Sequence, residues 1–303
     1  MRQAILILSV IVTAVVIGTS AVAYAKQSDN KKTSPETTDS PENTTSSEPT
    51  QPITIENHAW EKYHWAPTAL PFTLELADNV TGAWDSYLDT TVSDWNKSDV
   101  LDTTKIAGGT DPKDCDPTEG KVEVCNAKYG KKGWLGIATI WRSGEHITQA
   151  TAKLNDTYFN TKSYNKPAWR NLVMCQEVGH TFGLDHQDER YGNRNRDTCM
   201  DYTRKPGSNQ HPNQHDYDQL GAIYRLHLEE DESTTTGEPS TGDENESGDA
   251  PRAWGRETSR SSDGRESIYE KDLGKGKKKV THVLWTLEEA AKHRRGHNED
   301  HEH

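Results

Sequence analysis

The chain of 303 residues carries a net charge of −13 and is only 31% hydrophobic. This length accommodates one well-sized domain with tails, or two small domains. Soluble domains are about 45–50% apolar on average, so a large share of this chain is expected to lie outside a packed core. The excess of acidic residues argues against a generally basic surface, and no nucleic-acid partner is expected.

The first 25 residues combine a basic start with a long apolar run. Arg2 precedes a run from Ala4 to Ala23, and the segment closes with Ala23-Tyr24-Ala25. These features are typical of a secretory signal peptide. The run is about 20 residues long, which is also enough to span a bilayer, so an uncleaved anchor is the alternative. Both interpretations place the rest of the chain outside the cytoplasm, secreted or anchored at the cell surface, with membrane contact only if the segment stays uncleaved.

Composition divides the remaining chain into four parts. Residues 26–55 are rich in Ser, Thr and Pro and predict a disordered stalk, because they offer almost nothing to bury. Residues 56–228 predict a globular domain of normal size. Residues 229–265 are acidic and polar and predict a disordered linker. Residues 266–303 predict a β-hairpin, a short helix and a charged His-rich tail; since a lone hairpin is unstable, it should dock on the main domain or stay loose.

Strands and one helix are predicted before the central motif of the globular domain. The spacing of Trp84, Leu88 and Trp95 predicts an amphipathic helix over 80–96. Alternating or β-branched runs predict strands over residues 72–76, 100–106, 122–125, 134–141 and 146–154.

A longer helix is predicted from Asn165-Lys166-Pro167 to just before Gly183. Proline is tolerated in a first turn because its missing N–H would have no partner there. Glycine takes the left-handed conformation that ends a helix at no steric cost. The chain then turns, and a last helix is predicted over about 216–226.

Residues 176–186, with the sequence QEVGHTFGLDH, predict a zinc site. Gln176 and His180 are four residues apart and share one helix face, and His186 returns to it after the turn. A catalytic zinc takes three protein ligands and a water, whose pKa it lowers toward about 7. We therefore expect Gln176, His180 and His186 as ligands of Zn²⁺, and Glu177 as the general base that accepts the water's proton.

The unusual residue of this motif is Gln176, because zinc prefers nitrogen and sulfur ligands to an amide oxygen. In one outcome the Gln176 amide oxygen binds the ion with lower affinity, and the bound ion still hydrolyses peptides. In another, a histidine from a different segment fills the position, with His211, His215 or His146 as candidates. In a third, the site binds metal poorly and the fold only binds peptides. The retained Glu177 favours the first two outcomes, since a pure binding module has little use for a general base.

The four cysteines fit an exported protein, because disulfides persist in oxidising compartments. The sequence alone permits three pairings. We favour Cys115–Cys125, which closes a short loop, and Cys175–Cys199, which would tie the motif helix to the segment around Met200. Alternatively, Cys175 and Cys199 are small buried thiols, or Cys199 is a metal ligand.

The region from Trp60 to Leu228 resembles the metzincin metallopeptidases and is nearest in organisation to matrixin-like secreted proteases. The resemblance implies an α+β fold with a twisted, mostly parallel sheet, an active-site helix, a Met-turn under the metal and a C-terminal helix. It also implies that strand 136–141 is a sheet edge that pairs with an extended peptide. The residues that carry the resemblance are Glu177, His180, Gly183, His186 and the Met-turn residue Met200. The residues that it places around a specificity pocket are Tyr202, Thr203 and Pro206.

These features lead to one main hypothesis and one alternative. The main hypothesis is a secreted or surface-anchored zinc endopeptidase that acts as a monomer on peptide or protein substrates. The alternative is a metzincin-shaped module that binds peptides or mediates adhesion without catalysis.

Asp185 and Asp188 flank His186 in the sequence. They are candidates for hydrogen-bonding the ligand imidazoles and so orienting them, or for ordinary surface roles.

Overall fold

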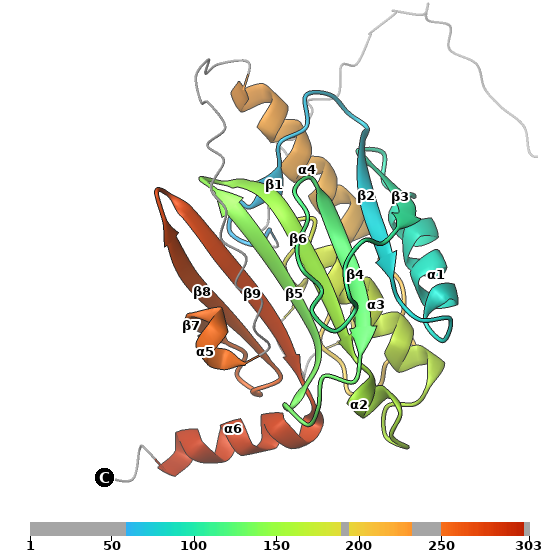
Figure 1. The fold of residues 1–303 in the computed structure, drawn as a ribbon, viewed down its shortest axis with the longest axis vertical. Coiled ribbons are helices and arrows are strands. Elements are labelled where there is room, and N and C mark those ends of the chain that lie inside the picture. The colour runs from blue at the N-terminus through green and yellow to red at the C-terminus, as the bar shows by residue number, and fades with distance from the viewer. Residues whose placement is uncertain (1–58, 189–193, 232–249, 300–303) are drawn as a thin grey trace, which may run out of the picture. The chain divides into compact units, whose positions relative to one another are not determined.

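This computed structural model describes residues 59–188, 194–231 and 250–299. These residues form a nine-stranded sheet with helices packed against it (Figure 1). The predicted signal peptide or anchor (1–25) and the predicted stalk (26–55) lie outside the described residues. Among the described helices, none is long and apolar enough to cross a membrane.

The sheet has a parallel half and an antiparallel half. Its strand order is β3-β2-β4-β6-β5-β9-β8-β7, and β1 pairs with β6 beside this path. Strands β1 to β4 and β6 pair in parallel, whereas β5 and β7 to β9 make antiparallel pairs. The fold therefore mixes helices and strands as expected, but the sheet is mostly parallel only in its first half. The strands are β1 (His64–Trp65), β2 (Phe72–Asn79), β3 (Leu101–Ala107), β4 (Lys121–Ala127), β5 (Trp134–Ser143), β6 (His146–Asn155), β7 (Arg256–Arg260), β8 (Glu266–Gly274) and β9 (Lys277–Trp285).

Helices α3 and α4 lie behind the strands in Figure 1, α1 lies beside the β3 edge of the sheet, and the short α5 lies in front of β8. Helix α6 begins directly after β9, where the Thr286 hydroxyl accepts a hydrogen bond from the Glu289 N–H at 3.2 Å. A threonine three residues before a glutamate is a common start of a helix, because the hydroxyl satisfies a backbone donor that has no helical partner. The helices are α1 (Asp85–Trp95), α2 (Asp156–Phe159), α3 (Pro167–His180), α4 (Gln214–Asp231), α5 (Pro251–Trp254) and α6 (Leu287–Glu299).

The C-terminal hairpin belongs to this sheet. Strand β9 pairs antiparallel with β5, from Trp134↔Trp285 to Ser143↔Lys277, and β8 follows β9. The prediction that 136–141 is an open edge for an extended peptide is wrong, because the chain's own β9 fills that position. Helix α5 and strand β7 also lie inside the stretch 229–265 that the sequence predicts as a linker.

Successive residues of β9 face opposite sides of the sheet, as in any strand. Val280 and Leu284 belong to the core cluster that packs around α3. Trp285 belongs to a second cluster, together with Trp254 of α5. His282 alternates in step with Val280 and Leu284, so its side chain faces α3.

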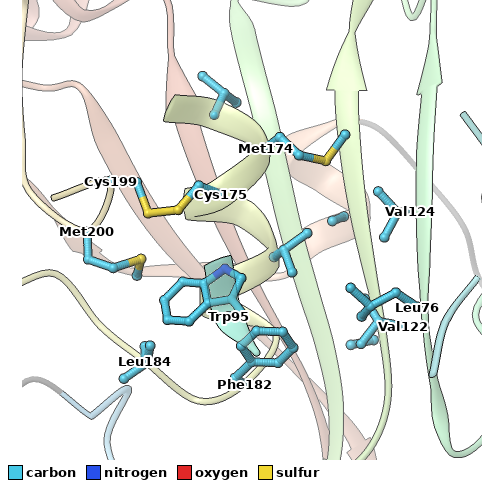
Figure 2. Close-up of a cluster of buried hydrophobic side chains, with 14 of the residues drawn as sticks. Leu76, Trp95, Val122, Val124, Met174, Cys175, Phe182, Leu184, Cys199 and Met200 are labelled. Atoms are coloured by element: carbon cyan, nitrogen blue, oxygen red, sulfur yellow. A yellow bond between two sulfur atoms is a disulfide. The ribbon is translucent and has the colours of Figure 1, made fainter. Parts of the chain in front are cut away.

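Helix α3 is buried along most of its length, because the sheet covers one face while α1 and the segment around Met200 cover the other. Figure 2 shows Trp95 of α1 and Met200 beside this helix, close to the disulfide that joins Cys175 and Cys199. Disulfides indicate an oxidising compartment, in agreement with export from the cytoplasm. The two disulfides that the sequence favours are both present, Cys115–Cys125 and Cys175–Cys199.

The turn after α3 is fixed by a close approach between two backbone segments. Gly183 has a φ of +89°, and a Cβ on it would lie 1.9 Å from the Tyr63 carbonyl oxygen, so only glycine fits there. The Phe182 carbonyl, two residues after the end of α3, accepts a hydrogen bond from the Tyr224 hydroxyl at 2.8 Å. These contacts direct His186 back toward the helix.

Candidate metal centre

Helix α3 directs a histidine, a glutamine and a glutamate into the space between itself and the sheet. His180 is 1% exposed and lies one turn after Gln176, which is 2% exposed. After the turn at Gly183, His186 returns to the same place, and its Nε2 lies 3.1 Å from Nε2 of His180. The two imidazoles that the motif predicts as ligands therefore meet.

The third imidazole of the cluster comes from β9. The ring centroid of His282 lies 4.0 Å from that of His180 and 5.1 Å from that of His186. One ligand nitrogen from each ring lies within 4.8 Å of the others. In the β5–β9 register His282 stands opposite Ala138, whose small side chain leaves the ring room to reach α3.

A carboxylate from β8 completes the cluster. Glu266 Oε2 lies 3.0 Å from His186 Nε2 and 3.1 Å from His282 Nε2. In the β8–β9 ladder Ile268, two residues along, pairs with His282, so Glu266 and His282 lie on the same, helix-facing side. Three imidazoles and one carboxylate, each at most 5% exposed, thus converge from α3, the turn after it, β8 and β9.

The hydrogen bonds around His180 leave ligand atoms directed at the centre of this cluster. The His180 Nδ1–H donates to the Leu184 carbonyl at 2.8 Å, so the neutral ring carries a lone pair on Nε2, the atom that faces His186. Two further buried oxygens, Gln176 Oε1 and Glu177 Oε1, have no hydrogen-bond partner among the described residues. Buried oxygens without a hydrogen-bond partner usually contact an ion or a water molecule. Zinc binds neutral imidazoles and carboxylates.

The structure places the other candidates for the third ligand as follows. Gln176 lies beside the cluster, with its Nε2 3.2 Å from His186 Nε2. His211 pairs with a carboxylate of α1, His215 lies in the first turn of α4, and His146 belongs to a different group of histidines. Of the histidines weighed from the sequence for this position, none joins His180 and His186.

Sequence reasoning missed His282 and Glu266, which lie in the segment predicted as a separate hairpin. The available signal was an ionisable residue alternating with apolar residues, as His282 does between Val280 and Leu284. A polar residue on a buried strand face is informative, because such faces are otherwise apolar.

Glu177 is fully buried beside the three histidines, with 0% of its surface exposed. Its Oε2 lies 3.4 Å from His282 Nδ1. Gly136 of β5 makes room for it, because a Cβ there would lie 2.5 Å from Glu177 Oε1. Burial raises the pKa of Glu177, although the hydrogen bond with His282 acts in the opposite direction.

Negative charge in the cluster is concentrated on Glu266. Burial favours the neutral acid, but the imidazoles of His186 and His282 outweigh it and lower the pKa of Glu266. Burial likewise opposes protonation of His186, yet the charge of Glu266 raises the pKa of His186 to about 10. Burial, together with the two neighbouring imidazoles, holds the pKa of His180 well below its usual value. His180 is therefore neutral, whereas His186 is protonated at neutral pH and would have to release a proton to bind a metal ion.

Several residues contact the histidines from outside the cluster. Met200 lies against the ligand-bearing turn of α3, since a Cβ on Gly179 would be 2.8 Å from Met200 Sδ. The Tyr202 ring centroid lies 4.6 Å from that of His186. The Asp185 carboxylate lies 3.4 Å from His186 Nδ1, where it can hold the orientation of that imidazole.

A small pocket, with room for about one water molecule, opens beside the cluster. Tyr202 lines it, as expected for a pocket wall, whereas Thr203 and Pro206 are not among its lining residues. Ligand sites typically measure about 300–1,000 Å³, so a substrate could reach the cluster only after neighbouring segments had moved. The remaining lining residues are Asp185, His186, Ser259, Arg260, Ser261, Glu266, Ser267, Ile268 and His282.

Comparison with models of known protein families and with curated proteins finds no match for this chain.

Proposed function

We propose that this protein is an extracytoplasmic zinc-dependent endopeptidase of the metzincin type, in which His282 takes the ligand position that Gln176 leaves open. The observation that carries the proposal is the convergence of His180, His186 and His282 beside the buried Glu177 carboxylate. Three imidazoles are a sufficient protein ligand set for a catalytic zinc. The motif helix supplies one of them, its following turn the second, and the C-terminal hairpin the third.

The residues around the ligands have separate tasks in this proposal. A zinc ion bound there would polarise a peptide carbonyl and lower the pKa of a water molecule. Glu177 Oε1, which has no hydrogen-bond partner among the described residues, would accept the proton of that water and pass it to the leaving amine. The bond from His180 Nδ1 to Leu184 and the Asp185 carboxylate beside His186 hold two of the rings in ligating orientation.

The C-terminal hairpin limits how a substrate can approach. It supplies His282, and β9 also occupies the side of β5 along which an extended peptide would otherwise pair. Substrate would therefore enter through the pocket between Tyr202 and strands β7 and β8. Because this pocket has room for only about one water molecule, β7 and β8 would have to move aside even for a flexible peptide, and we expect no cleavage of folded proteins.

A second candidate function is a metal-holding module without catalysis. It is favoured by Glu266, whose Oε2 lies within hydrogen-bond distance of both His186 and His282. If Glu266 also binds the ion, three imidazoles and one carboxylate fill a tetrahedral shell, and no position is left for an exchangeable water.

The experiment that tests the proposal measures zinc content and casein cleavage for the full chain and for Glu177→Gln. Glu123→Gln is the matched control, since Glu123 is also buried, at 2% exposure, but bonds to Asn79 instead of lying at the cluster. General-base catalysis contributes roughly 10²–10⁴-fold, so cleavage should fall by that factor in Glu177→Gln only, with zinc retained in all three proteins. Zinc without cleavage in the unmodified chain would favour the metal-holding module, and a zinc-free cluster would rule out both functions.

A further inference from the structure

A second group of three histidines lies where β1, β6 and α4 meet. His64 is in β1, His146 is the first residue of β6, and His227 lies in the last turns of α4. The parallel β1–β6 register places His64 directly beside His146. The ring centroids form a nearly equilateral triangle, with sides of 5.1, 4.7 and 5.2 Å. This triangle shares no residue with the cluster around His282.

The nitrogens of this second group face one another as metal ligands do. One nitrogen from each ring lies within 4.8 Å of the others, and His64 Nε2 is 3.1 Å from His227 Nδ1. His64 and His227 are only 7% and 3% exposed, whereas His146 is half-buried. Two of the rings are thus withdrawn from water, and the third lies at the surface.

The outward nitrogens of the two buried rings are held by backbone carbonyls. His64 Nδ1 donates to the Lys62 carbonyl at 2.6 Å, and His227 Nε2 donates to the Pro67 carbonyl at 3.2 Å. A carbonyl can only accept, so each neutral ring carries its lone pair on the other nitrogen. These are the nitrogens that face each other at 3.1 Å. Two facing lone pairs repel unless a cation lies between them, and an outer carbonyl that orients the ring is the usual partner of a metal-bound histidine.

We propose that His64, His146 and His227 bind a structural divalent transition metal, with zinc as the ion that fits best. Neutral imidazole is a good ligand for Zn²⁺, Cu²⁺ and Ni²⁺ and a poor one for Mg²⁺ and Ca²⁺. Three imidazoles leave one tetrahedral position, which a water can fill on the exposed side of His146.

The ion would join a short strand to two other elements of the fold. Strand β1 has two residues and pairs with β6 outside the main path of the sheet. Its neighbour Tyr63 packs its carbonyl against Gly183, at the turn that leads to His186. A cation shared by β1, β6 and α4 would therefore hold the segment against which the turn after α3 is built.

The experiment counts zinc in full-length protein whose tail histidines His297, His301 and His303 are replaced by alanine, so that the tail cannot bind metal. A second change, His282→Ala, disables the other cluster, and this protein is expected to keep one zinc per chain after dialysis. Adding His146→Ala or His227→Ala should remove that zinc, whereas the control His211→Ala should not. Of these substitutions, His146→Ala should disturb the fold least, because His146 is half-buried and lies at the end of its strand.

Thermal unfolding gives a measurement that does not depend on stoichiometry. Zinc should raise the unfolding temperature of the His282→Ala protein, and this shift should vanish when His146→Ala is added. The proposal is overturned if the His282→Ala protein holds no zinc and shows no shift, which would mean that only a proton lies between His64 and His227. It is equally overturned if the zinc and the shift survive both His146→Ala and His227→Ala. Because all these proteins carry His282→Ala, the result is independent of the proposed peptidase activity.

Discussion

The imidazole of His282 lies against that of His180, with ring centroids 4.0 Å apart, although α4, α5, β7 and β8 separate the two residues along the chain. The cluster is therefore complete only when β9 has paired with β5. Binding free energy at a site that folding assembles is also folding free energy. Zinc and the docking of the C-terminal hairpin should accordingly stabilise each other.

The first prediction separates His282 from Gln176 as the third ligand. His282→Ala should lose the zinc of this cluster, because only two imidazoles remain. Gln176→Ala should keep it, because the three imidazoles are intact. Loss of a supporting group costs about 10–100-fold in metal affinity, so we expect at most that reduction for Gln176→Ala and a larger one for His282→Ala. Zinc affinity is measured by competition with a chromophoric chelator.

The contradicting result for this pair is a reversal of the two effects. If Gln176→Ala releases zinc and His282→Ala retains it, the amide completes the ligand set and His282 only fills space. Tail histidines should be replaced by alanine in both proteins, so that binding at His297, His301 and His303 does not hide the difference.

The second prediction concerns Glu266, which contacts both His186 and His282. Glu266→Gln keeps the shape of the side chain and removes its charge. If three imidazoles hold the ion, zinc affinity should fall by about 10–100-fold, as for a supporting group, and casein cleavage should persist at saturating zinc. Complete loss of zinc would show that Glu266 is an obligatory ligand, which favours the non-catalytic module.

The third prediction concerns Gly136, which makes room for Glu177. In Gly136→Ala the new Cβ would lie 2.5 Å from Glu177 Oε1 and 2.6 Å from Val173 Cγ1. Overpacking of this kind costs about 1–3 kcal/mol, and it should displace the carboxylate, so cleavage should fall much more than zinc content. The matched control is Gly109→Ala, which meets nothing within 4 Å. Equal activity of the two variants would mean that Glu177 does not act from its observed position.

The fourth prediction concerns the turn after α3. Gly183→Ala places a side chain at a φ of +89° and 1.9 Å from the Tyr63 carbonyl oxygen. The left-handed backbone alone costs a non-glycine residue about 1–2 kcal/mol, and the overlap adds to it. Urea unfolding should show a loss of more than about 2 kcal/mol for Gly183→Ala. For Gly207→Ala, which has open space around it, the change should stay within about 0.5 kcal/mol. Similar free energies of unfolding for both would contradict the described turn.

Much of the fold is predictable because its signals are local. The run Trp134–Trp141 predicts β5 (Trp134–Ser143), and a proline near the start with Gly183 near the end brackets α3. The motif itself places His180 and His186 together, since helical spacing and one turn suffice to bring them into contact. In each case the deciding residues are neighbours in sequence.

The third imidazole could not be predicted, because it depends on pairing between distant strands. The sequence indicates a strand around His282 but not its partner, and a shift of one residue in register would turn that side chain to the opposite face. The observed register sets His282 opposite Ala138 of β5. The same pairing explains why 136–141 is not the open edge that the resemblance implies.

Anomalous diffraction at the zinc edge, on crystals of the full chain grown with zinc, tests the central claim most directly. We predict a peak about 2.0–2.1 Å from one nitrogen each of His180, His186 and His282, the usual length of a zinc–imidazole bond. A peak bound by the Gln176 oxygen with His282 turned away, or no peak between these rings, would contradict it.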